Sequence, residues 1–322
     1  MVNGTKLTPV RVERAITRLA KNFQRGEKLS RASMQQSFDV LKAFRELLVQ
    51  HEVSSFVCGA TGVLRRAANT DEFRINAKRL TGLSISILSE QTEAMLSAKG
   101  MLSVLSATPH RILLFDLGGS STEFLLIDPE QSEPVWDQSV FIGAATITEK
   151  YLPGDPPTKG AIDTAINAIH CEIEPVLERV TRYLLAHTLA SEDLLVVATA
   201  GTVTTLAAIY LQMVSYEPYR VNGLVLSRRW LHSMIDRLAS LSAQSRQGIP
   251  GLEKGREDII LGGALIVAGI LDNLKLEQFT VTDAGLLEGL LLDLIEKECK
   301  IPQTLRTPLT WYWQKSRRPI TE

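Results

Sequence analysis

Apolar runs and amphipathic stretches alternate along the 322-residue chain. Runs rich in Val, Ile, Leu and Phe predict strands, and they cover 53–60, 83–90, 111–117, 122–128, 135–143, 194–198 and 278–282. Apolar residues that recur every three or four positions predict helices over 30–48, 158–187, 227–241 and 258–274, and from 284 onward. Alternating strands and helices are typical of an α/β protein.

Length and a change of pattern indicate two domains. A chain of 322 residues is longer than a single hydrophobic core usually supports. After Pro109 the pattern changes to closely spaced strands, so we expect the boundary within 97–110. The predicted organisation is an N-terminal domain over 1–97, a second domain over 98–300 and an irregular tail over 301–322.

The first residues predict part of a hairpin. Asn3-Gly4 is a dipeptide favoured in two-residue hairpin turns, and the TKLTPVRV segment that follows suits the second arm. The first arm is missing from this pattern, which indicates that the chain begins inside a strand. The other interpretation is an Asn-Gly pair in a frayed terminus.

Composition excludes some partners. The net charge of −1 and the 22% of charged residues argue against a nucleic-acid partner, so any polyanion site must be local. An excess of Lys and Arg within residues 1–31 favours an anionic ligand or is a solvated basic face.

Three widely spaced cysteines suit a reducing compartment. No segment is typical of a signal peptide or a membrane span, so we expect a cytoplasmic protein without a membrane partner.

A glycine-rich turn between two predicted strands is the first candidate for chemistry. Gly118, Gly119, Ser120 and Ser121 form this turn, with Asp116 before it and Glu123 after it. Glycines let a backbone approach an anion closely, and turn N–H groups can cradle phosphate. Asp116 can hold hydrated Mg²⁺, and Glu123 returns close enough to orient a water. Acidic residues at both ends make the turn more specific than a glycine-rich turn alone.

Three weaker candidates have plain structural explanations. The turn before Gly201 and Thr202 leads into a helix whose N-terminus suits phosphate, but it is equally an ordinary strand–turn–helix joint. Arg65 follows a predicted strand and can grip phosphate or remain a solvated cation. Glu93 lies near a helix start, where acidic residues are often only partners of the helix dipole.

Taken together, these motifs resemble the exopolyphosphatase and guanosine pentaphosphate phosphatase family, over nearly the whole chain. The matching stretches are ATGVLRRAANTDEF, ISILSEQTEAM, LLFDLGGSSTEFLLID, VVATAGTVTTLAA, IPGLEKGREDIILGGALI and VTDAGLLEGLL, in the order of the family. The resemblance implies two ribonuclease-H-like domains of the sugar kinase, actin and heat-shock ATPase fold, enclosing a cleft.

The resemblance also implies roles for individual residues. Glu93 matches the catalytic base, and Glu123 matches a second carboxylate that positions metal or water. Asp116 matches the metal-binding Asp, for Mg²⁺ or another divalent cation. The residues that match phosphate-binding positions are Arg65, Gly118, Gly119, Ser120, Ser121, Gly201 and Thr202.

The chain also departs from the family pattern. The family opens with an Asp-x-Gly-Ser turn, and counting back from the matched positions places that turn before Met1. Ser120 stands where a third Gly is usual, and Met95 and Leu287 replace usual arginines. These differences tune the choice of substrate or accompany a loss of activity.

Three functions are compatible with these features. The first is a hydrolase that releases terminal phosphate from inorganic polyphosphate, guanosine pentaphosphate or both. The second is a catalytically weak regulatory protein that binds polyphosphate or nucleotide, and the third is a phosphotransferase of the same fold. The tail residues Trp311, Tyr312 and Trp313 form a homodimer contact or belong to a loosely packed terminus.

Overall fold

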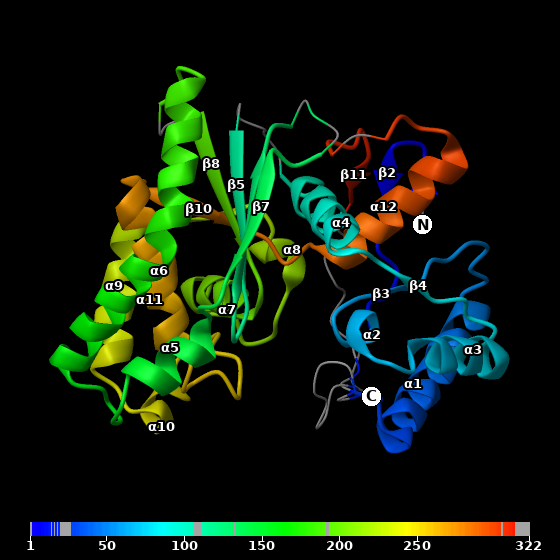
Figure 1. The fold of residues 1–322 in the computed structure, drawn as a ribbon, viewed down its shortest axis with the longest axis horizontal. Coiled ribbons are helices and arrows are strands. Elements are labelled where there is room, and N and C mark those ends of the chain that lie inside the picture. Colours follow the sequence, from blue (N-terminus) through cyan, green and yellow to red (C-terminus); the bar gives the residue numbers. More distant parts are fainter. Residues whose placement is uncertain are drawn as a thin grey trace. The chain divides into compact units, whose positions relative to one another are not determined.

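The computed structural model describes residues 2–13, 15, 17, 19, 27–105, 111–129, 131, 133–190, 193–303 and 305–312. The chain forms two compact units. Unit 1 contains the residues up to Gly100, Leu286–Gln303 and the described residues from Thr307 on. Unit 2 contains Met101–Gly285 with Leu305 and Arg306. Figure 1 shows the elements of both.

Short strands and five helices of the described chain make up unit 1. They are β1 (Val2–Asn3), β2 (Lys6–Leu7), α1 (Arg31–Gln50), β3 (Gly59–Ala60), α2 (Val63–Arg66), α3 (Thr70–Thr81), β4 (Ser86–Ile87), α4 (Glu90–Leu102), α12 (Leu286–Cys299) and β11 (Thr310–Trp311). The Ser30 hydroxyl caps α1 by accepting from the Ser33 N–H at 3.1 Å, as its position predicted. Phe38 of α1 stacks on Phe73 of α3 with ring centroids 5.0 Å apart.

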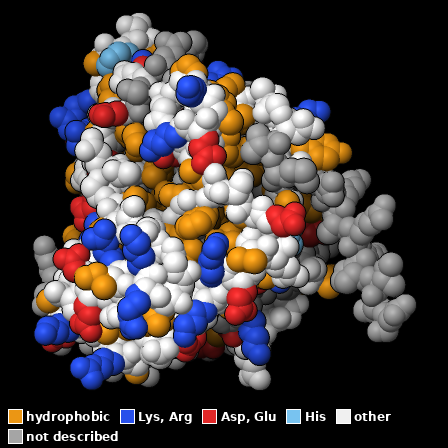
Figure 2. All heavy atoms as spheres, turned by 90° about the vertical axis from the view of Figure 1, so that its right-hand side faces the viewer, with side chains coloured by type: hydrophobic (Ala, Val, Ile, Leu, Met, Phe, Trp, Pro, Cys, Tyr) orange, Lys and Arg blue, Asp and Glu red, His pale blue; other side chains and the backbone are white. Residues whose placement is uncertain are grey.

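The strands predicted over 53–60 and 83–90 are much shorter in the structure. Only Gly59–Ala60 pairs with Ser86–Ile87, in parallel. Before β3, Val53, Phe56 and Val57 are each about 40% exposed, so this apolar segment is not enclosed on both faces as a buried strand would be. Figure 2 shows hydrophobic side chains at the surface among side chains of both charges.

Both ends of the described chain meet in one small sheet. β1 pairs with β2 through a two-residue turn at Gly4 and Thr5, one residue later than predicted, with Val2 opposite Leu7 as the first arm. Thr310–Trp311 then pairs in parallel with Lys6–Leu7, so the predicted irregular tail contains a strand. The rest of the tail, 313–322, and the basic residues Arg14, Arg18, Lys21 and Arg25 lie outside the described residues.

Helix α12 corrects the predicted domain organisation. The prediction placed it in the second domain with 98–300, but α12 belongs to unit 1. Leu292 and Ile295 pack with Leu7 and Leu309, and Leu290 packs with Leu88 and Leu96. Long-range apolar contacts decide this membership, and sequence order does not reveal them.

Unit 2 is built on a mixed sheet. Its elements are β5 (Arg111–Leu117), β6 (Thr122–Ile127), β7 (Trp136–Val140), α5 (Ala144–Tyr151), α6 (Lys159–Ala186), β8 (Leu194–Thr199), α7 (Gly201–Tyr210), α8 (Pro218–Val221), β9 (Leu224–Ser227), α9 (Arg228–Ala239), α10 (Ala243–Arg246), α11 (Ile260–Leu274) and β10 (Gln278–Val281). The strand order is β7-β6-β5-β8-β10-β9. β5, β6 and β7 are antiparallel, and β8 and β10 run parallel to β5. This is the ribonuclease-H-like α/β arrangement that the resemblance implied.

Helices cover one face of this sheet. In Figure 1, α5, α6, α9 and α11 lie together on one side of it. Nearly all residues of α11 are buried, as expected of a helix that is apolar all round. Alternate residues of β5, namely Leu113, Phe115 and Leu117, belong to the core formed with these helices. Asp116 therefore lies on the opposite face of the sheet.

Among the described residues, no helix combines the length and apolar content that crossing a membrane requires.

A strained residue joins β8 to α7. Ala200 has φ 77° and ψ 176°, a region that Gly adopts almost exclusively. The Thr204 N–H donates to the Ala200 carbonyl at 2.9 Å as the first bond of the helix. The chain therefore turns sharply from the sheet into the helix at Ala200, whose Cβ makes this conformation unfavourable.

We expect Ala200→Gly to stabilise the protein. Relief of strain of about 1–3 kcal/mol exceeds the entropic disadvantage of Gly, about 0.5–1 kcal/mol. The melting temperature should rise by about 2–4 °C. Ala207→Gly, in the buried interior of the same helix, is the control and should lower it. A decrease for both variants would show that Ala200 is not strained.

Candidate active site

Two carboxylates face each other on the sheet of unit 2. Asp116 of β5 and Glu123 of β6 are register partners in the antiparallel pair, so their side chains leave the same face. The same row continues to Thr199 on β8 and Ser139 on β7. Like charges directly opposite each other destabilise a sheet. Two carboxylates on one row are therefore a set of oxygens that could hold a cation.

The glycine-rich turn lies directly beside this pair. Gly118 donates its N–H to the Ser121 carbonyl at 3.0 Å, which closes the turn between β5 and β6. Within the described part of the chain, the N–H groups of Gly119, Ser120 and Ser121 have no acceptor. Gly119 and Ser120 are exposed. Such free N–H groups beside a sheet end are suited to phosphate oxygens.

The start of α5 fixes the shape of this turn. The N–H groups of Ala144 and Ala145 donate to the carbonyls of Gly118 and Gly119 at 3.0 and 2.9 Å. A Cβ at Gly143 would overlap the backbone of Gly119 and Ser120. The turn carbonyls thus bind the helix N-terminus, which leaves the turn N–H groups for a ligand.

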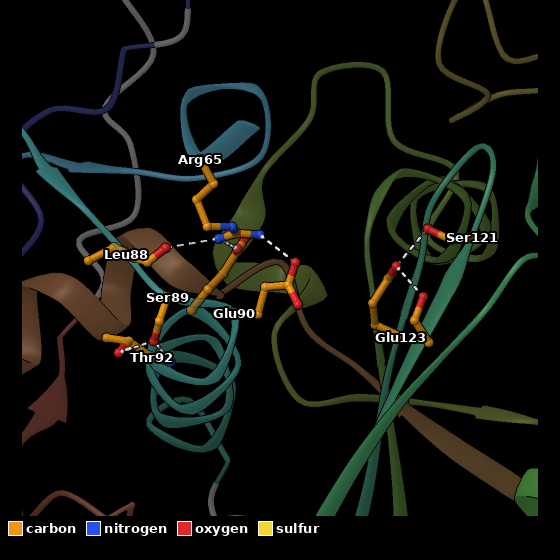
Figure 3. Close-up of polar contacts among 9 residues, drawn as sticks. Arg65, Leu88, Ser89, Glu90, Thr92, Ser121 and Glu123 are labelled. Carbon is orange, nitrogen blue, oxygen red and sulfur yellow. Dashed lines mark hydrogen bonds and ion pairs between the residues drawn. The ribbon is translucent and has the colours of Figure 1, made fainter. Parts of the chain in front are cut away.

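Neighbouring hydroxyls hold the Glu123 carboxylate. Ser121 Oγ donates to Glu123 Oε1 at 2.6 Å, and Ser139 Oγ donates to the same oxygen at 3.2 Å (Figure 3). Ser121, predicted to bind phosphate, therefore uses its side chain to orient Glu123. The described residues contain no cluster of three or more His, Cys, Asp or Glu that would enclose a metal ion. The donor set here is two carboxylates and nearby hydroxyls, which fits Mg²⁺ because this ion usually keeps waters and substrate phosphates as ligands.

The joint between β8 and α7 offers a second set of N–H groups. No side chain caps α7, and the N–H groups of Gly201, Thr202 and Val203 have no acceptor among the residues described. A helix N-terminus of this kind favours anions. The Thr202 side chain is only 2% exposed and packs against Gly263 of α11. Its hydroxyl is therefore part of the core, and only its backbone N–H remains for a ligand.

Arg256 is a candidate that the sequence did not single out. Its guanidinium lies over Gly201, so closely that a Cβ there would overlap it. Glu253 binds Arg256 Nε, and the guanidinium remains partly exposed. In the sequence, the IPGLEKGRED loop between α10 and α11 is only part of a matching motif, because its proximity to Gly201 arises from tertiary structure.

Glu257 holds this loop in place. Its carboxylate accepts from the Gly255 N–H at 2.6 Å and from Gln247 Nε2 at 2.9 Å. Hydrogen bonds from its own N–H and from that of Gly255 lower the pKa of Glu257. The carboxylate thus stays charged and keeps the loop beside α7.

Arg65 and Glu93 form an ion pair in unit 1. Arg65 Nη1 donates to Glu93 Oε2 and, at 3.1 Å, to the Leu88 carbonyl. The Arg65 and Glu93 side chains are 20% and 32% exposed, so both remain within reach of a ligand. Two residues that the family resemblance singled out, 28 positions apart in the chain, are therefore in direct contact.

Glu90 is a more distant neighbour of the same arginine. Its Oε1 lies 3.9 Å from Arg65 Nη2, and its side chain is 88% exposed (Figure 3). Ser89 caps the helix, because its Oγ accepts from the Thr92 N–H at 3.0 Å. Glu90 thus fits a surface residue of the first helical turn, whereas Glu93 is held by a specific partner.

Comparisons with known proteins identify the family of the chain. The model of the Ppx/GppA phosphatase family matches residues 1–298. Exopolyphosphatase 2 of Mycobacterium tuberculosis is 28% identical over 298 residues, which cover 90% of this chain and 90% of that protein. A guanosine-5'-triphosphate,3'-diphosphate pyrophosphatase of Photobacterium profundum is 27% identical over 296 residues, covering 92% of this chain and 56% of that protein.

Solved structures give the same assignment. The crystal structure of the Aquifex aeolicus member of the Ppx/GppA family has a TM-score of 0.76 and 25% identity, and the match covers 90% of each chain. A second Aquifex aeolicus structure, of a PPX-GPPA enzyme, has a TM-score of 0.72 and 26% identity and covers 86% of this chain and 88% of that chain. The resemblance noted in the sequence is confirmed, and the chain belongs to the Ppx/GppA phosphatase family.

Proposed function

We propose that this protein is a phosphoanhydride hydrolase of the cytoplasm, which releases terminal phosphate from inorganic polyphosphate, guanosine pentaphosphate or both. One observation carries the proposal: the opposed carboxylates of Asp116 and Glu123 adjoin a turn with three N–H groups that have no acceptor among the described residues. Both substrates end in the same phosphoanhydride group, so both fit this chemistry.

Hydrolysis of a phosphoanhydride demands charge neutralisation and an oriented water, with little covalent work by the protein. Asp116, with Glu123 beside it, would hold Mg²⁺ or another divalent cation. When bound, this ion neutralises phosphate charge and polarises the phosphoryl oxygen. The hydroxyls of Ser121 and Ser139 hold the Glu123 carboxylate in one orientation through their hydrogen bonds to Oε1.

Backbone N–H groups and two arginine side chains would bind the phosphate oxygens. The turn N–H groups of Gly119, Ser120 and Ser121 form one set, and the first N–H groups of α7 form another. Arg256 adds positive charge at Gly201. Arg65 supplies a guanidinium fork, which matches two phosphate oxygens.

Glu93 would act as the general base. It accepts the proton of the attacking water while the water oxygen bonds to the terminal phosphorus and the bridging P–O bond breaks. Orthophosphate leaves, and the electron pair of the broken bond stays on the shortened substrate. The contact with Arg65 keeps the Glu93 carboxylate beside the group that would grip the phosphate.

The function is tested by phosphate release from long-chain polyphosphate and from guanosine pentaphosphate, with and without Mg²⁺. We expect release that depends on Mg²⁺ from at least one substrate. Binding of polyphosphate without release would replace the enzyme by the regulatory binding protein. Transfer of labelled phosphate to a small acceptor would support the phosphotransferase.

Replacing the base should separate turnover from binding. We expect Glu93→Gln to lower kcat by roughly 10² to 10⁴ and to leave polyphosphate binding largely intact, because the amide keeps its shape and loses basicity. Glu90→Gln is the control, since Glu90 is exposed three residues away, and it should change kcat little. Unchanged turnover in Glu93→Gln would remove Glu93 from the mechanism.

Weakening the metal ligand should shift the metal titration. Asp116→Asn removes a negative oxygen, so we expect a higher Mg²⁺ concentration at half-maximal rate. Asp137→Asn makes the same change at an exposed position of β7 and should leave the titration unaltered. Identical Mg²⁺ curves for Asp116→Asn and the unchanged protein would contradict the assigned role.

A further inference from the structure

A buried ion pair lies on the helix that carries Glu93. Lys99 of α4 binds Glu296 of α12, and their side chains are only 6% and 0% exposed. Glu93 stands in the first turn of α4, and Lys99 stands less than two turns later. The pair therefore connects the helix of the proposed base to α12, the last helix of the described chain.

The same two helices approach closely at a second point. A Cβ at Gly289 of α12 would overlap the Leu96 carbonyl oxygen of α4. Gly289 and Glu296 are seven residues apart on α12, so they lie on similar faces of that helix. Leu96 and Lys99 are three residues apart on α4 and are likewise neighbours on its surface. A backbone contact and an ion pair thus define one helix–helix interface.

The interface also reaches Arg65. Leu290 of α12 packs with Leu88 and Leu96. A Cβ at Gly59 would lie 3.0 Å from side-chain atoms of both Leu290 and Leu88, which shows how tightly this cluster is filled. The Leu88 carbonyl accepts from Arg65 Nη1 at 3.1 Å. α12 therefore supports both partners of the Arg65–Glu93 contact.

Stability alone does not account for the ion pair. Apolar residues of similar volume often replace a buried ion pair without loss of stability. Glu296 Oε1 is buried and has no hydrogen-bond partner in the described chain, so the pair is not fully satisfied. Leu–Leu packing tolerates small shifts along a helix, whereas a buried ion pair is satisfied in one register.

We propose that Lys99 and Glu296 are positioning residues, which fix the register of α4 on α12 and thereby hold Glu93 against Arg65. The expected effect of the pair on turnover rests on the proposed hydrolase function. Its effect on how rigidly α4 is held does not depend on that function.

The test removes both charges and then restores them in reverse. Lys99→Met with Glu296→Leu leaves no unpaired buried charge, and Lys99→Glu with Glu296→Lys reverses the pair. We expect the apolar variant to fold but to lose kcat by about 10- to 100-fold on polyphosphate, with KM changed less than about threefold. The reversed variant should recover most of this kcat. Lys297→Met is the control, because it breaks the adjacent exposed pair with Asp293, and it should keep the original kcat.

Amide hydrogen exchange of residues 90–96 decides the question without turnover. We expect faster exchange in the apolar variant and normal exchange in the reversed variant and in Lys297→Met. If the apolar variant does not fold, Glu296→Gln takes its place in both assays. If its exchange and kcat match the unchanged protein, the positioning role is wrong. If no variant turns over but exchange follows the expected order, the hydrolase proposal fails while the role of the pair in ordering α4 stands.

Discussion

Two carboxylates on one sheet row set the polar surroundings of the turn between β5 and β6. Asp116 and Glu123 are register partners, so neither can leave the other without breaking the β5–β6 pair. Donors surround these carboxylates: Ser121 and Ser139 bind Glu123, and the turn beside it presents N–H groups that have no acceptor in the described part of the chain. Gly143 lets α5 support the turn from behind. The carboxylates and the donors together suit the proposed binding of a cation with an anion.

At the β8–α7 joint, the backbone geometry also presents N–H groups that suit an anion. Ala200 takes a conformation that costs about 1–3 kcal/mol, and the structure retains it because the buried strand and helix on either side over-determine the turn. The result is an uncapped helix N-terminus with Arg256 over Gly201. A strained residue and a guanidinium at one place are typical of functional sites.

Sequence patterns predicted the features that depend on interactions between residues close together in the chain. The strand over 111–117 and the Ser30 cap agree with the structure, because apolar runs and capping residues act within a few positions. The burial of Thr202, the placement of Arg256 and the membership of α12 depend on distant residues, which no local pattern encodes. The β3 strand was predicted too long because its apolar residues do not face a second layer.

Unit 1 is formed by chain segments that precede and follow unit 2 in the sequence, and both kinds of segment surround Glu93. Arg65 and Glu93 are 28 residues apart, but Lys99 and Glu296 are separated by 197. Non-local contacts of this kind form late, since a long loop must close before they contribute. Unit 1 therefore cannot reach its final packing until α12 has been synthesised and has docked. α4, which carries the proposed base, therefore depends on α12, the last helix among the described residues, for its final packing.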